Sequence, residues 1–513
     1  MIALKKLSMS VAAVALIAAC AASHETEKSV AAAPGAVAPV APPAPPPPPP
    51  APPSTPDAEF RNAKPAAAAA AVQFIAPVPT EKTLANGAKL LVVENHAVPL
   101  ASIDLLIETG ADGEPLGKTG LAKFTAAMLE EGTAKRSATE LASQLENLAA
   151  QHFAIAGQET IRVHMNCLTE TLPQCLALLA DMAVHPAFRK EDLERTRGLL
   201  LADVAQKQAN PAALARDEMA RVVYGAKSPW GQPAGGTEAT LKAITEADLR
   251  RFHADYFRPT NAIISISGDV AAGQAAQLVT EAFASWKKEP RKTVKMPKVA
   301  ASEKRETILV DKAGASQSQV WVFGTAVSAK DADAVPLRVT SYILGGPFAR
   351  LDMNIREGKG YSYGVRSSVS LMREHGIWAA QGGVKANVTA EALVEYEREL
   401  KGLATGALRE GELKNAQEGL IRSLPSQLER NDAVSAAMAT LAFNGQPLDY
   451  YRTLPAEVAK VDGAAVARVA AKYDRPGAWS VVIVGPKAVV EARLNQSKYG
   501  EVELPVAAPP AAK

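Results

Sequence analysis

The feature of this sequence that most constrains its fold is an internal repeat. Residues 241–268 align without a gap on residues 458–485, at a constant offset of 217 positions. Both copies carry apolar residues at helical spacing, then a proline that ends the helix, then a β-run closed by glycine. Because the spacing is kept over the whole stretch, we expect two copies of one domain.

Each copy is expected to begin with strands and to continue with helices. The predicted strands fall at residues 89–94, 102–108, 161–167, 262–266, 306–310, 318–323 and 479–484. The predicted helices fall at residues 119–131, 191–207 and 334–344. This order predicts an α+β fold of two homologous repeats, each a mixed or antiparallel sheet covered by helices on one face.

The first 19 residues have the pattern of a secretory signal. Lys5 and Lys6 precede an apolar run that is too short to span a membrane. The run ends in Ile17-Ala18-Ala19-Cys20, which resembles the bacterial lipobox, whose cysteine is lipidated. Three acyl chains on Cys20 would anchor the protein in the periplasm, and Ala21 in place of Asp favours the outer membrane. The alternative is a plain secretory signal with an incidental cysteine.

Residues 20–78 are rich in alanine and proline and include six consecutive prolines, Pro45–Pro50. Such a segment extends as polyproline II at ~3.1 Å per residue, so we interpret it as a spacer; a ligand for a proline-binding domain is the alternative. The rest divides into an N-terminal domain, a basic linker, a C-terminal domain and a disordered tail, at residues 79–286, 287–305, 306–500 and 501–513.

Charge and cysteine content limit the partners of the chain. The 56 Lys and Arg against 54 Asp and Glu give a net charge of +2 without long runs of either sign, so we expect no nucleic-acid partner. No apolar run beyond residue 19 approaches the ~18 residues of a membrane span. Besides Cys20 only Cys167 and Cys175 occur; they could pair in an oxidising compartment, but buried thiols are favoured.

Gly120–Thr133, with the sequence GLAKFTAAMLEEGT, resembles the signature helix of the M16 metallopeptidases, the family of pitrilysin, insulinase and mitochondrial processing peptidase. The repeat, Gly235–Thr237 and Phe257–Asn261 resemble the same family, and the likeness runs from about residue 79 to residue 490. The resemblance implies that the two repeats form one half of an M16 clamshell.

Active members of the family carry His-x-x-Glu-His on this helix. The two imidazoles at i and i+4 bind zinc on one face, and the Glu acts as general base. Here the three positions are Lys123, Ala126 and Ala127, and the resemblance places the third ligand at Asp203, a carboxylate one methylene shorter than Glu and without companion ligands. An ammonium at Lys123 would also repel a dication. We therefore expect no metal or other cofactor on this chain and no catalytic residue on it.

Two other kinds of site are considered and disfavoured. His152, His164 and His253 lie away from the helix and are interpreted as packing or surface residues rather than a rebuilt zinc site. Gly360–Gly364 fits the Gly-x-Ser-x-Gly elbow of serine hydrolases, but a helix-like segment precedes it and a strand-like one follows, the reverse of the order that the elbow requires.

Arg356 and, seven residues on, Tyr363 match a pair that active M16 enzymes use in their C-terminal domain. The resemblance implies that the two side chains bind the substrate backbone and stabilise the transition state. The alternative is a surface arginine and a core tyrosine without such a role.

Together these features suggest a non-catalytic, periplasmic subunit that binds peptide and pairs with a zinc-bearing M16 homologue. The partner would bring the zinc helix, and this chain would bring Arg356 and Tyr363. No autonomous peptidase activity is expected. The competing hypothesis is a non-enzymatic peptide-binding or scaffold clamshell without a peptidase partner.

Overall fold

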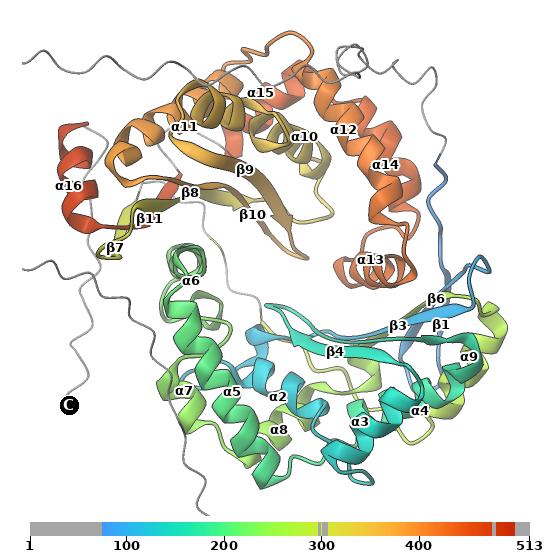
Figure 1. Cartoon of the computed structure of the whole chain (residues 1–513). Helices are drawn as coiled ribbons and strands as arrows, with labels where there is room; N and C mark the ends of the chain where they lie inside the picture. Colours follow the sequence, from blue (N-terminus) through green and yellow to red (C-terminus); the bar gives the residue numbers. More distant parts are fainter. Residues whose placement is uncertain (1–73, 296–298, 300–305, 474–478, 498–513) are drawn as a thin grey trace, which may run out of the picture. The chain divides into compact units, whose positions relative to one another are not determined.

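The structure is a computed structural model that describes residues 74–295, 299, 306–473 and 479–497 (Figure 1). All of these residues belong to one compact unit of the chain. The predicted secretory signal, Cys20, nearly all of the spacer, most of the second half of the basic linker and the tail lie outside the described residues. Among the described helices, none has the length and apolar character needed to cross a membrane.

Two sheets form the framework of the fold (Figure 1). The first has the strand order β1-β2-β6-β3-β5-β4 and the second the order β7-β11-β8-β10-β9. The strands of the first sheet are β1 (Thr80–Thr83), β2 (Lys89–Glu94), β3 (Leu100–Ile107), β4 (Gln151–Ala156), β5 (Ile161–Leu168) and β6 (Ala262–Gly268). Those of the second are β7 (Thr307–Asp311), β8 (Gln317–Ala326), β9 (Ser362–Leu371), β10 (Gly376–Lys385) and β11 (Ser480–Gly485).

The helices lie between and after the strands along each repeat (Figure 1). In the first repeat they are α2 (Leu121–Leu129), α3 (Ala138–Asn147), α4 (Leu172–Val184), α5 (Lys190–Gln208), α6 (Pro211–Tyr224), α7 (Glu238–Ala243), α8 (Glu246–Tyr256) and α9 (Ala272–Ala282). In the second they are α10 (Ala334–Gly345), α11 (Thr389–Ala404), α12 (Glu412–Gln427), α13 (Asn431–Asn444), α14 (Tyr450–Ala459), α15 (Gly463–Tyr473) and α16 (Lys487–Gln496). The chain also forms a π-helical turn, η5 (Asp352–Gly358), and a short 3₁₀ turn, η3 (Pro229–Gly231).

The two sheets repeat one topology, which confirms the predicted duplication. β2 pairs with β6 in parallel and β7 pairs with β11 in parallel, and every other pair is antiparallel. α8 and α15 begin and end 217 positions apart, the offset of the sequence repeat. The fold is therefore α+β with two mixed sheets, as predicted.

The main core of each repeat lies between one face of its sheet and its own helices. In the first repeat Leu90 and Ile103 of the sheet pack with Phe124 of α2 and Leu176 of α4. In the second repeat, side chains of the sheet such as Val320 pack with α10, α11 and α15. Cys167 and Cys175 belong to the first core as two buried, unpaired thiols.

Each repeat also lends one helix to the opposite face of the other repeat's sheet. Val434 and Met438 of α13, from the second repeat, pack on Leu91 of β2 and Ile263 of β6. In return, Ala215 of α6 packs on the second sheet, where β8 and β11 form its contact face (Figure 1). The sequence pattern shows that each helix has an apolar face but not which sheet that face packs on. This exchange of helices was therefore not predicted.

Candidate functional site

The degenerate zinc position lies between α2 and α5. α2 carries Lys123 and α5 carries Asp203, eighty residues further along the chain. Lys123 Nζ lies 3.0 Å from Asp203 Oδ2. Of the four positions that correspond to the family's zinc site, the structure thus brings together the two that are most distant in sequence. The Asp203 carboxylate is therefore paired with an ammonium group, which neutralises its charge.

The remaining two positions offer no ligand. Ala126 is buried in the core of the first repeat, and Ala127 is half-buried on the next position of α2. Within the residues that the structure describes, no group of three or more His, Cys, Asp or Glu side chains is placed to hold a metal ion. The Lys123–Asp203 pair is partly exposed, so it contributes at most about 1 kcal/mol to stability.

The histidines considered as replacement ligands are separated from one another. His152 Nε2 lies 3.4 Å from Glu130 Oε1, and His164 Nδ1 lies 3.0 Å from Asp104 Oδ1. His253 is hydrogen-bonded to the carbonyl oxygen of Ala183. These contacts agree with the interpretation of packing residues.

The N-terminus of α2 is capped by the buried carboxyl group of Glu114. Its Oε1 accepts hydrogen bonds from the backbone N–H groups of Gly120 and Ala122, at 3.1 and 2.8 Å. Carboxylates stabilise this end of a helix because its first N–H groups have no partners inside the helix. Burial nevertheless raises the pKa of Glu114 to about 8, so ionisation is opposed in the folded state.

The raised pKa of Glu114 predicts a dependence of stability on pH. Its folded-state pKa lies above the ordinary value of 4.5, so its contribution is full below pH 4.5 and is lost as the pH rises through about 8. The free energy of unfolding should fall across this range by up to about 1.4 kcal/mol per pH unit. Glu114→Gln keeps an acceptor for the helix and should flatten the fall. Urea unfolding of both proteins at pH 5, 6.5 and 8 measures this; parallel slopes would contradict the assignment.

Arg356 and Tyr363 lie in direct contact. The Arg356 guanidinium carbon is 5.4 Å from the centroid of the Tyr363 ring, a cation–π distance. Tyr363 is 87% exposed, which rules out the alternative of a core tyrosine. Arg356 belongs to the π-helical turn η5 and Tyr363 to the start of β9, so a turn and a strand edge together present the pair.

A β-bulge turns Tyr363 outward. In the β9–β10 ladder, Gly383 pairs with Gly364 and Val384 pairs with Ser362, so Tyr363 has no residue opposite it. Bulges of this kind re-aim a side chain and are frequent beside functional sites. The exposure of Tyr363 therefore follows from the backbone.

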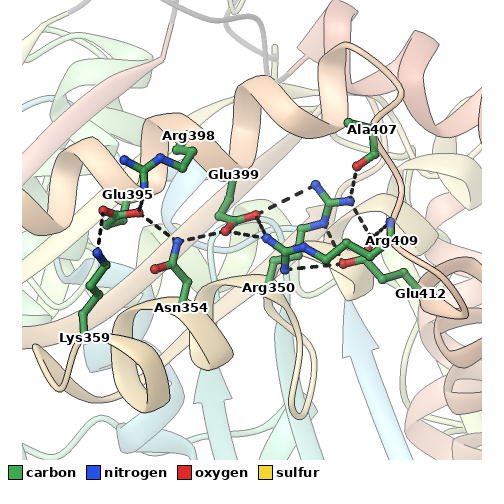
Figure 2. Close-up of polar contacts among 9 residues, drawn as sticks. All are labelled: Arg350, Asn354, Lys359, Glu395, Arg398, Glu399, Ala407, Arg409 and Glu412. Carbon is green, nitrogen blue, oxygen red and sulfur yellow. Dashed lines mark hydrogen bonds and ion pairs between the residues drawn. The ribbon is translucent and has the colours of Figure 1, made fainter.

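A network of charged side chains holds η5 against α11 (Figure 2). Asn354 Nδ2 donates to Glu395 Oε2 and Glu399 Oε1 at 3.0 and 2.8 Å, so one amide bridges two buried carboxylates. Arg350 binds Glu412 through Nε and Nη2 at 2.9 and 2.5 Å, and its Nη1 lies 3.9 Å from Glu399. Removing one partner of such a buried pair typically costs about 3–5 kcal/mol, so the network fixes the turn that carries Arg356.

Ser362 does not behave as a serine nucleophile. Its Oγ donates to the carbonyl oxygens of Gly364 and Gly383, at 3.0 and 2.6 Å. It begins β9 directly after η5, so the required order of strand, turn and helix is absent from this segment. The structure agrees with the rejection of a hydrolase elbow.

An edge strand lies near each of the two candidate sites, β4 beside α2 and β9 at Tyr363. The sequence did not show which strands would lie at the edges of the sheets. β4 is the last strand of the first sheet and packs on α2, and β9 is the last strand of the second sheet. The outer backbone groups of such strands have no strand partner and can pair with an extended peptide. β4 was not predicted. Phe153 and Ile155 are exposed on it, and the alternation of these two large apolar residues with alanines was the signal available in the sequence.

Comparison with known proteins shows the family on both repeats. The model described as Insulinase (Peptidase family M16) matches residues 89–232. The model described as Peptidase M16 inactive domain matches residues 243–420.

Similar proteins occur in several bacteria. The "Uncharacterized zinc protease YmxG" of Bacillus subtilis is 25% identical over 388 residues, which cover 75% of this chain and 93% of that protein. The "Non-peptidase homolog YmxG" of Helicobacter pylori is 26% identical over 386 residues, covering 73% and 87% of the two chains.

Solved structures share the fold. The peptidase M16 inactive domain of Pseudomonas fluorescens superposes with a TM-score of 0.74 at 23% identity, covering 80% of this chain and 98% of that one. A protease of Helicobacter pylori superposes with a TM-score of 0.75 at 21% identity, covering 80% and 100%. With both family models matching in order and the fold shared, the chain belongs to peptidase family M16.

Proposed function

We propose that this chain is a non-catalytic subunit of a periplasmic, heteromeric M16-type zinc peptidase. The main support for the proposal is that the chain lacks the zinc ligands of the family but keeps its Arg–Tyr pair. Around α2 the Lys123–Asp203 pair stands where zinc ligands would be needed, whereas the half-buried Arg356 is in contact with the exposed Tyr363. A chain of this kind supplies substrate binding and transition-state stabilisation to a partner that supplies the zinc.

The chemistry of the pair suits this role. The Arg356 guanidinium and the Tyr363 hydroxyl are hydrogen-bond donors, and donors aimed at a developing oxyanion stabilise the transition state of peptide hydrolysis. Because Tyr363 is exposed in the single chain, a second subunit is needed to exclude water around it. The open edges of β4 and β9 offer places where an extended peptide could pair.

Purification of the native complex tests the proposal. The tagged full chain is extracted from cell envelopes with mild detergent, and co-eluting proteins, zinc and peptidase activity are measured. We expect a second M16 chain with an intact His-x-x-Glu-His motif, one zinc per complex, and activity that neither chain shows alone. A chain that elutes only with itself, or with proteins unrelated to peptidases, would contradict a peptidase subunit.

The second candidate function is a peptide-binding or scaffold protein without a peptidase partner. The name "Non-peptidase homolog" of the relative from Helicobacter pylori favours this possibility for a chain of the same family. Here peptides would bind along the open strand edges and would not be cleaved. Peptide binding without turnover in every purified complex would support this second function.

We also propose that Cys20 is lipidated and holds the protein in the outer membrane. The support comes from the sequence, where Ile17-Ala18-Ala19-Cys20 ends a secretory signal. Cys20→Ser should move the protein from the membrane fraction to the soluble periplasmic fraction, while Cys167→Ser, at a buried thiol, should not. A Cys20→Ser protein that sediments with membranes in cells lacking the partner would contradict the anchor.

A further inference from the structure

A cavity of about 340 Å³ lies between α6 and the second sheet. Arg216 and Tyr224 of α6, Trp321 of β8 and Gln381 of β10 line it. Trp230, in the η3 turn that follows α6, also lines it. We call this cavity the α6 pocket. It depends on the exchange of helices, because α6 comes from the first repeat and the strands come from the second.

Four side chains of the α6 pocket have unpaired polar atoms. Gln158 Nε2, Trp230 Nε1, Trp321 Nε1 and Gln381 Oε1 are buried and have no hydrogen-bond partner in the described part of the chain. Trp230 and Trp321 are only 1% and 5% exposed. Buried polar groups are nearly always paired, because leaving them unpaired costs free energy. A ligand that supplies partners would recover that free energy.

The unpaired polar atoms of the α6 pocket favour a ligand that carries hydrogen-bond acceptors. Three of the four atoms are N–H donors, and an indole nitrogen can only donate. Arg216 adds a guanidinium 6.0 Å from the Trp321 ring centroid, and it forms no ion pair with the residues that the structure describes. Three acids are adjacent in sequence to lining residues. Asp217 is paired with Lys207 and Glu218 with Arg221. Burial raises the pKa of the third, Glu159, to about 7, which weakens its negative charge at neutral pH. Several donors with an unpaired cation match a carboxylate.

We infer that the α6 pocket binds a carboxylate group of a peptide, either its C-terminal carboxylate or an Asp or Glu side chain. This inference rests on the proposed function, since it assumes that the chain binds peptides. Ser368 and Ser370 of β9 line the same pocket, five and seven residues beyond Tyr363. At ~3.3 Å per residue the pocket lies about 17–23 Å along the strand from Tyr363. A peptide of six to eight extended residues could contact both.

The test compares three peptides on the purified full chain in detergent. The first is an N-acetylated hexa-alanine with a free C-terminus, the second is its C-terminal amide, and the third is the amide with one Asp in the middle. Affinities are measured by calorimetry, and tryptophan fluorescence, to which Trp230 and Trp321 contribute two of five indoles, gives a second readout. We expect at least one of the two carboxylate peptides to bind ~10-fold more tightly than the neutral amide, as for a gained hydrogen bond to a charged group. The better of the two identifies the source of the carboxylate.

Two variants assign the preference to the pocket. Arg216→Gln removes the unpaired cation at an exposed position, and Trp321→Phe keeps an aromatic ring but removes the N–H. Each should reduce the ~10-fold preference to less than ~3-fold without lowering the melting temperature by more than a few degrees. Arg221→Gln is the matched control, because Arg221 lies on the same helix and is paired with Glu218 at 2.6 Å; it should keep the full preference.

Three outcomes would overturn the inference. Equal affinity for all three peptides would contradict carboxylate binding in the α6 pocket, and so would a preference that is kept in both Arg216→Gln and Trp321→Phe. Either result leaves peptide binding by the chain intact. If none of the three peptides binds, both carboxylate binding in the α6 pocket and the peptide-binding part of the proposed function are contradicted. The two failures are therefore distinguishable.

Discussion

A variant with Lys123→His, Ala127→His and Asp203→Glu should bind one zinc ion per chain, whereas the natural chain should retain none after dialysis. The side chains at 123 and 203 already meet at 3.0 Å, so the backbone of α2 and α5 is placed for a shared ion. Residue 127 lies one turn after 123 on the same face of α2. Three protein ligands and a water make a tetrahedral zinc site. The affinity should reach at least the micromolar range, about 8 kcal/mol of binding free energy.

Residue 126, the position of the general base, stays alanine in this variant. Ala126 is 1% exposed, and a glutamate there would have to fit into the core. Zinc binding needs only the ligands, so the three changes suffice. The control carries Lys123→Gln, Ala127→Gln and Asp203→Glu, which keeps size and polarity but removes the imidazoles. Metal analysis by mass spectrometry decides the result; a folded histidine variant without zinc would show that α2 and α5 do not keep the zinc geometry.

The second large effect should come from Arg356 and Tyr363 in the assembled complex. Arg356→Ala or Tyr363→Phe should leave assembly intact and lower turnover by ~10²-fold, the scale expected for losing one oxyanion donor. The loss should appear in kcat if the side chains act on the transition state, and in KM if they only hold the peptide. Tyr363 is 87% exposed, so its change to Phe should alter stability by less than about 0.5 kcal/mol.

A matched control separates a local effect from a general one. Arg422 is exposed on α12 and is paired with Glu418 at 3.2 Å, outside the network around η5. Arg422→Ala should leave kcat and KM unchanged. If Arg356→Ala and Tyr363→Phe complexes also kept both constants, the pair would have no role in catalysis, and the scaffold function would be favoured.

The sequence by itself determined the duplication and most of the sheet framework. Helix and strand periodicity is local, so the repeat at offset 217 predicted α8 and β6 in one half and α15 and β11 in the other. The spacing of Arg356 and Tyr363 within one turn and one strand start is equally local. The absence of zinc ligands at positions 123 and 127 and of a general base at position 126 can be read directly from the residues.

Tertiary structure alone decided which distant groups meet. Lys123 and Asp203 are eighty residues apart, and only the packing of α2 beside α5 turns two isolated charges into a pair. In the same way the amphipathic pattern of α6 requires an apolar partner but does not say which sheet provides it. The α6 pocket follows from that choice, because Trp321 and Trp230 belong to different repeats. Local sequence sets the conformation of each element, whereas burial of its apolar face depends on contacts that no short segment encodes.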